Sequence, residues 1–297
     1  MRKQQKLGKY DLFDKVNVVI MVIMMIVMIY PLWYTVVGAF NDGYDYMRGG
    51  VYFLPRVFTL DNFKAVFFDD TILHAFLITI LKCVIGTVTS VLFTAWVSYG
   101  LTRSNLIGRK FYLALMMFTM YFSGGMIPTF ILIKNLGLYD SFWVYIIPSL
   151  FSVWNMVIMQ SFMRELPPAL IEAAKIDGAS EYRIFFSIVL PLCKPVLAAV
   201  ALFTVVNHWN SYFDAMLYTN SQDLQTIQLF LNKVITDPSV SNSLGSAAAT
   251  NIPEAARTIT SQSIKFAAMV VTALPVVVVY PFLQKYFVKG MTIGAVK

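Results

Sequence analysis

Long, nearly uncharged apolar runs are the dominant pattern along this chain. Six runs reach about the 20 mostly apolar residues that a helix needs to cross the hydrocarbon core of a bilayer. Four of them hold no charged residue, one contains Lys82, and one contains Lys194 near its start. The pattern therefore predicts an all-α integral membrane protein with six transmembrane helices, at residues 16–40, 72–99, 111–133, 142–162, 191–213 and 266–284.

The composition indicates the same class of protein. Hydrophobic residues make up 58% of the 297 residues and charged residues 13%, whereas a soluble domain carries about 25% charged residues. The mean hydropathy is +0.67. So few charges cannot cover the surface of a soluble protein of this length, and so many apolar residues exclude disorder. The two cysteines lie far apart in apolar surroundings and are not a disulfide framework.

Lysine and arginine are divided unequally between the two sides of the predicted helices. Fifteen lie in the two terminal tails and in the loops after the second and fourth helices, and six lie in the other loops. Because loops rich in Lys and Arg stay on the cytoplasmic side, both termini are predicted to be cytoplasmic. The outer loops hold ten carboxylates against six bases, so the net charge of +7 reflects topology, and no nucleic-acid partner is expected.

The predicted spans set the boundaries of the parts of the chain. Residues 1–15 form a cytoplasmic N-terminal tail, 16–288 the six-span membrane domain, and 289–297 a cytoplasmic C-terminal tail. Within the membrane domain, residues 163–190 form a cytoplasmic loop. The longest outer loop, 219–263, is rich in Ser, Asn, Thr and Ala and is expected to be the main soluble element.

The residues that an enzyme would need are missing. The two histidines, His74 and His208, exclude a zinc site of the H-E-x-x-H type or a histidine cluster, so no metal ligands are predicted. No phosphate-binding G-x-x-x-x-G-K-[ST] loop and no G-x-S-x-G nucleophile motif is present. No span centre holds an acidic residue that could serve an aspartate pair. If ATP drives this protein, another chain must supply the nucleotide site.

The cytoplasmic loop between the fourth and fifth spans has the pattern of two short helices. Pro168 suits a first helical turn, Gly178 can adopt the left-handed conformation that ends a helix, and Pro191 ends the second helix. The second helix has an apolar face made by Ile184, Phe185, Ile188 and Val189. Such a pair suits either a groove on a partner protein or the surface of the bilayer, and the pattern alone favours neither.

The spacing of residues in this loop is that of a known motif. The sequence E-A-A, three residues, G, nine residues and I-x-L-P is met in full between residues 172 and 191. This resembles the EAA loop of the membrane subunits of bacterial ABC importers, in which the loop is a coupling helix that docks into the ATP-binding subunit. The resemblance implies that ATPase coupling involves Glu172, Ala173, Ala174, Asp177, Gly178, Ile188, Leu190 and Pro191.

Shorter matches spread over most of the chain resemble the carbohydrate, maltose-type group of these permeases. They are FLP at 53–55, TLDNF at 59–63, WN at 209–210, KG at 289–290 and GAVK at 294–297. Two further stretches, GGMIPT at 124–129 and LGL at 136–138, resemble permeases that import oligosaccharides from polysaccharide breakdown. The expected protein is thus a type I ABC importer permease, multi-pass in the bacterial cytoplasmic (inner) membrane.

The resemblance also implies a set of partners. A six-span member pairs with a second homologous permease subunit, two ATP-binding subunits and an extracellular sugar-binding protein. The substrate is then an oligosaccharide. No cofactor is expected on this chain, because Mg-ATP is held by the partner ATPase.

Polar residues inside the spans are candidates for the substrate pathway. A charge such as Lys82 costs at least ~2.5–3.5 kcal/mol at the centre of a membrane helix. Lys82 therefore either extends to the outer surface or faces a polar cavity. A second group lies toward the outer end of the fifth span: Asn207, Trp209, Asn210, Tyr212 and Asp214. Amides, carboxylates and aromatic faces suit sugars, so we predict a place on the translocation path, with contacts to the second permease as the alternative.

Three other functions are kept as alternatives. The chain could be an ABC permease for another solute, such as amino acids or phosphate. It could also be a membrane scaffold or sensor that does not transport. A membrane enzyme ranks third, because the catalytic residues are missing.

Overall fold

The computed structural model describes residues 12–68, 70–248 and 259–293, with side chains up to residue 279. Within these ranges the chain is helical and forms no strand, apart from an isolated bridge between Asn41 and Phe58. The chain divides into two compact units. One contains the described parts of 1–68 and 234–271, and the other those of 69–233 and 272–297.

Three helices are long and apolar enough to cross a membrane: α1 (Leu12–Ala39), α4 (Asp70–Thr102) and the stretch Ser261–Val279 of α15 (Ser261–Ile293). Two further candidates are bent pairs. Helices α5 (Arg109–Tyr121) and α6 (Met126–Asn135) meet at 116°, and Glu181–Leu192 meets α11 (Lys194–Asn210) at 80°. The described residues therefore give three continuous spans, or up to five when each bent pair is one span.

Three predicted spans are not continuous helices. The run 191–213 bends at Cys193 and contains α11, which ends at Asn210. For the other two, local signals that hydropathy ignores explain the break. The run 111–133 breaks at residues 122–125, where Gly125 has a φ of +90° that favours glycine. The run 142–162 holds only a short 3₁₀ turn, η1 (Phe142–Tyr145), and the 12-residue helix α7 (Val153–Arg164). Pro148 lies in the non-helical stretch between them, and the Ser152 side chain caps α7 by accepting from the Asn155 amide.

The remaining elements are short. The unit with the chain's first helix holds α2 (Gly43–Met47), α3 (Asp61–Phe67) and α14 (Pro238–Ala248). The loop 163–190 holds α8 (Pro168–Ile176), α9 (Glu181–Ile184) and the π-helical turn η2 (Phe185–Val189), which continues into α10 (Leu190–Leu192). After α11 come α12 (Phe213–Tyr218), the 3₁₀ turn η3 (Gln222–Leu224) and α13 (Ile227–Thr236).

A polar network orders the loop after α1. Arg56 forms an ion pair with Asp45 at 2.9 Å, and Asn41 accepts the backbone amides of Arg56 and Val57. The buried Asn62 amide donates to the carbonyls of Ala39 and Asn41, at 2.9 and 2.8 Å. These bonds attach α3 to the C-terminal end of α1, which fixes the path of the chain as it leaves the first apolar helix.

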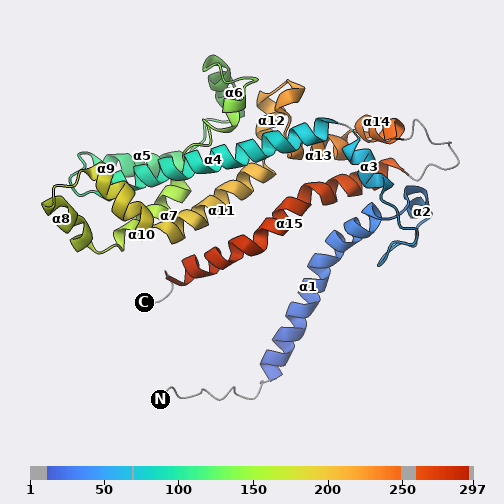
Figure 1. The fold of residues 1–297 in the computed structure, drawn as a ribbon, viewed down its shortest axis with the longest axis horizontal. Helices are drawn as coiled ribbons and strands as arrows, with labels where there is room; N and C mark the ends of the chain where they lie inside the picture. Colours follow the sequence, from blue (N-terminus) through green and yellow to red (C-terminus); the bar gives the residue numbers. More distant parts are fainter. Residues whose placement is uncertain (1–11, 69, 249–258, 294–297) are drawn as a thin grey trace. The chain divides into compact units, whose positions relative to one another are not determined.

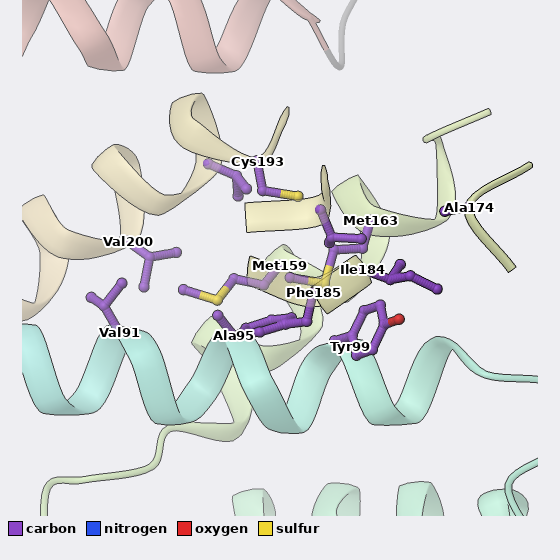
Figure 2. Close-up of a cluster of buried hydrophobic side chains, with 12 residues drawn as sticks. Val91, Ala95, Tyr99, Met159, Met163, Ala174, Ile184, Phe185, Cys193 and Val200 are labelled. Carbon is purple, nitrogen blue, oxygen red and sulfur yellow. The ribbon is translucent and has the colours of Figure 1, made fainter. Parts of the chain in front are cut away.

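The second unit is built around α4, which packs along α7 and α11 (Figure 1). A ridge of small or polar residues recurs every fourth position of α4 and is buried: Gly86, Ser90, Thr94 and Ser98. Small residues at this spacing let membrane helices approach closely. The neighbouring ridge, with Val91, Ala95 and Tyr99, faces Met159, Phe185 and Val200 in a buried apolar cluster (Figure 2).

Candidate functional site

The loop 163–190 folds as a helix pair joined by a tight turn. Helix α8 begins at Pro168 and ends with Asp177 as its C-cap. Gly178 follows with a φ of +76°, a left-handed conformation that glycine adopts without strain, and the Ala179 amide donates to the Ala174 carbonyl at 2.9 Å. Ser180 then caps α9 by accepting the Arg183 amide.

The motif residues divide between an exposed group and a packed group. On α8 and its turn, Glu172, Ala173, Asp177 and Gly178 are exposed, whereas Ala174 is buried in the apolar cluster of Figure 2. In the second half, Ile188 and Leu190 pack against the same cluster and Pro191 is exposed. The loop thus presents a short exposed helix outward and attaches it to the helix bundle through α9, η2 and α10.

Glu181 connects both halves of the loop to α4. One carboxylate oxygen, Oε1, lies 2.7 Å from the Lys175 ammonium of α8, and the Tyr99 hydroxyl of α4 donates to the other, Oε2, at 2.5 Å. The Arg103 guanidinium lies 4.1 Å from the centre of the Tyr99 ring. The sequence analysis did not select these residues, because no local pattern pairs Glu181 with a tyrosine 82 positions earlier.

These contacts make the stability of the loop depend on pH. The Lys175 hydrogen bond, followed by the Tyr99 hydrogen bond, lowers the pKa of Glu181 below its ordinary value. The charged form is therefore favoured in the folded state, so its contribution is present above the unfolded pKa and is lost as the pH falls through the folded pKa.

We expect Glu181→Gln to destabilise the protein near neutral pH by about 1 kcal/mol or less, since the carboxylate is half exposed and screened. The difference in thermal unfolding between the two proteins should shrink as the pH falls below the ordinary pKa range of a glutamate, because the lowered pKa of Glu181 delays the uptake of its proton to that range. A difference that stays constant from pH 7 to pH 3 would contradict the role of the Glu181 charge.

A polar cavity of about 560 Å³ lies in the second unit, within the range of small-molecule pockets. Its wall combines α4, residues 149–155, α11 and α12. The sequence analysis selected two of its lining residues, Asn207 and Asp214, and did not select Ser90, Ser149, Ser152, Asn155 or Thr204 as site residues. Serines and threonines in apolar runs carry no distinguishing signal, which is why they were missed.

The structure does not bring the other outer-end residues to this cavity. Trp209 is buried, and its indole N–H donates to the Thr272 carbonyl of α15 at 3.3 Å. The Asn210 side chain is bonded to the Val206 carbonyl of its own helix, and Tyr212 lies outside the lining. Residues that are neighbours in the sequence do not all face the cavity, because successive residues of a helix point in different directions.

Lys82 does not extend to an exposed surface; its side chain is fully enclosed. Its ammonium lies 2.9 Å from Ser211 Oγ, 3.3 Å from the Ser211 carbonyl and 3.3 Å from Asp214 Oδ2. It also lies 4.7 Å from the centre of the Tyr145 ring. Ser211 and Asp214 lie 129 and 132 positions away, so the sequence could not reveal them. Lys82 stands behind the cavity wall and holds Ser211 and Asp214, which line it.

His208 depends on a glycine of α4 for its place in the wall. A Cβ atom added to Gly86 would lie 2.5 Å from His208 Nε2, which is closer than any packed contact. We expect Gly86→Ala to displace the imidazole and cost about 1–3 kcal/mol, measured as a lower thermal unfolding temperature in detergent. Gly100→Ala on the same helix meets nothing within 4 Å and is the matched control. Equal effects at both positions would contradict the close approach.

Comparison with known proteins identifies the family to which this chain belongs. The model of a family described as "Binding-protein-dependent transport system inner membrane component" matches residues 92–293, which include the whole helix-pair loop. The chain belongs to this family. The predicted resemblance to importer permeases is thereby confirmed.

Individual members of the family are similar over nearly the full chain. Protein LplC of Bacillus subtilis (strain 168) is 38% identical over 286 residues, covering 96% of this chain and 95% of LplC. The polygalacturonan/rhamnogalacturonan transport system permease protein YtcP of the same organism is 37% identical, covering 97% and 99%. A crystal structure of a bacterial ABC transporter involved in importing the acidic polysaccharide alginate has a chain with a TM-score of 0.87 and 29% identity, covering 94% and 99%.

Proposed function

We propose that this chain is a transmembrane subunit of an ATP-driven oligosaccharide importer in the bacterial inner membrane. The observation that carries the proposal is the exposed helix α8, bearing Glu172, Ala173, Asp177 and Gly178, in a member of the binding-protein-dependent transport family. The relatives named for polygalacturonan, rhamnogalacturonan and alginate support saccharides as the class of substrate.

The proposed mechanism is alternating access. A loaded binding protein docks outside, ATP closes the partner ATPase dimer, and α8 moves with the ATPase surface into which it docks. The motion opens the cavity outward, and hydrolysis returns it inward. A ligand shifts such an equilibrium only through different affinities for the two states, so the binding protein must prefer the outward-open state.

The proposed assembly contains a second homologous permease, two ATP-binding subunits and an external sugar-binding protein. Ala173 and Gly178 permit close approach to the ATPase, and Glu172 and Asp177 offer carboxylate acceptors to its basic or backbone donors. Nucleotide chemistry is assigned to the ATPase partners. The loop carries the coupling, and Ile188, Leu190 and Pro191 join it to α11.

The proposed topology has six spans with both termini cytoplasmic. It assigns residues 1–15 and 289–297 to cytoplasmic tails, 163–190 to the coupling loop and 219–263 to the outer loop. The unequal distribution of lysine and arginine supports this orientation. Along the proposed sugar path, Asn207 and Asp214 contact the substrate, and Lys82 holds Asp214 in place.

The test is to purify the tagged chain from its native host in mild detergent and identify the proteins that accompany it. We expect a second permease and an ATPase, with Mg-ATP hydrolysis that the binding protein stimulates. Ala173→Arg on the exposed face of α8 should remove the ATPase from the complex, whereas Ala169→Arg, on the first turn of the same helix and outside the motif, should retain it. Recovery of the chain without any ATPase would contradict the proposal.

A further inference from the structure

Helix α4 runs without a break from the coupling loop to the cavity. Tyr99 contacts Glu181 near one end, Ser90 lines the cavity, and Lys82 holds Ser211 and Asp214 behind its wall. The 17 residues between Lys82 and Tyr99 correspond to about 25 Å of continuous α-helix. A displacement of the Tyr99 end therefore moves the cavity wall with it, provided that the loop holds α4 firmly.

The turn at Gly178 is the weak point between the docking helix and the rest of the loop. Nothing lies within 4 Å of a Cβ atom built on Gly178, so the turn is open on its outer side. Ala174 is the single buried residue of α8. The Ala179–Ala174 backbone hydrogen bond closes the turn itself, but with so little side-chain packing α8 can pivot about it unless a side-chain contact also crosses it.

Glu181 supplies that contact, through two bonds of unequal strength. The pair with Lys175 crosses the Gly178 turn, but both side chains are about half exposed, and such surface pairs are weak. The bond from Tyr99 is charge-assisted and starts from a side chain that is only 7% exposed, so it is the stronger of the two. Glu181 thus fixes the loop chiefly to α4, and Lys175 adds α8 to the same group.

We propose that Glu181 is a positioning residue for coupling: it makes α8, α9 and α4 move as one body, so that closure of the ATPase reaches the cavity through α4. This inference rests on the proposed function and adds a residue outside the EAA motif. Without the Glu181 contacts, α8 still docks and ATP is still hydrolysed, but the motion is absorbed at the Gly178 turn.

The experiment measures uptake and ATP hydrolysis in the same proteoliposomes, using the complete importer purified from its host and an oligosaccharide that the wild type accumulates. The variants are Glu181→Gln and Tyr99→Phe, singly and together. Glu165→Gln is the matched control. It removes the same charge from the C-cap of α7, before the helix pair begins at Pro168 and outside the EAA motif, where the described structure shows no side-chain partner. The readout is sugar transported per ATP hydrolysed, because a merely structural defect lowers both rates together.

We expect each single variant to lower this ratio about tenfold, which is the effect of losing one charge-assisted hydrogen bond. The rate of ATP hydrolysis should stay within about twofold of the wild type. The double variant should be no worse than Glu181→Gln alone, because Glu181→Gln already removes the charge that both the Tyr99 bond and the Lys175 pair depend on. Three outcomes would each overturn the inference. Glu181→Gln and Tyr99→Phe could both keep the wild-type ratio, their losses could add up in the double variant, or Glu165→Gln could lower the ratio as much as they do. If Glu181→Gln does not assemble, Tyr99→Phe, which removes only a hydroxyl, decides. Absence of ATP-driven uptake in the wild type would instead refute the proposed function.

Discussion

We expect the replacement of Gly178 by arginine to abolish transport while the protein still inserts into the membrane. Two effects combine at this position. The φ of +76° makes any side chain there strained by about 1–2 kcal/mol. The arginine side chain also projects from the exposed turn next to Glu172 and Asp177, where the ATPase is proposed to dock. A steric and charge mismatch of roughly 3 kcal/mol at an interface lowers its occupancy about 100-fold, so uptake should fall to about 1% or less.

A second glycine separates the docking effect from backbone strain. Gly137, after α6, has a φ of +69° and is equally open, with nothing within 4 Å of an added Cβ atom. Gly137→Arg therefore carries the same strain at a position outside the coupling loop. Labelled-sugar uptake and copurification of the ATPase should be lost in Gly178→Arg and retained in Gly137→Arg. Wild-type uptake by Gly178→Arg would refute the role assigned to the loop.

Removing the two members of the Lys82–Asp214 pair should have unequal effects on stability. The Lys82 side chain is fully buried, whereas the Asp214 side chain is 40% exposed to the cavity. Asp214→Ala leaves a buried ammonium without its counter-charge, which costs about 3–5 kcal/mol when a buried pair is broken. Lys82→Met leaves a carboxylate that water can reach, so we expect a clearly smaller loss.

The double variant Lys82→Met, Asp214→Ala is the control for this prediction. Because it removes both charges, it should be more stable than Asp214→Ala alone, although Asp214→Ala carries fewer substitutions. Thermal unfolding in detergent, followed by loss of the monodisperse peak, measures the order of the three variants. A double variant less stable than Asp214→Ala, or a larger loss in Lys82→Met, would contradict the burial and pairing of Lys82.

The apolar pattern predicts the helical class and the long helices, and it fails where backbone geometry decides. The runs 16–40, 72–99 and 266–284 correspond to α1, α4 and the apolar part of α15. Hydropathy does not register the left-handed Gly125 or the Ser152 cap, so the two runs between residues 111 and 162 are broken in the structure. In these stretches the conformational preferences of single residues decide where a helix ends, and the apolar content does not.

Part of the candidate site can also be predicted from the sequence, and part of it cannot. The fixed spacing of the EAA motif and the glycine at its centre locate the coupling loop, because a turn at one residue is a local property. The contacts that build the rest of the site are distant in the sequence: Tyr99 and Glu181 are 82 positions apart, and Lys82 and Asp214 are 132 positions apart. Such pairs are created by the packing of α4 against α9, α11 and α12, and no spacing within one element encodes them.

The most direct test of the proposed transport function is solute uptake by the complete importer. The purified assembly would be reconstituted in vesicles with its binding protein and offered a mixture of oligosaccharides from plant and algal polysaccharides, together with amino acids and phosphate. Mass spectrometry of the vesicle contents then identifies what accumulates with ATP but not with a non-hydrolysable analogue. We predict ATP-dependent accumulation of one class of oligosaccharide. Accumulation of amino acids or phosphate alone, or of no solute, would contradict the assignment.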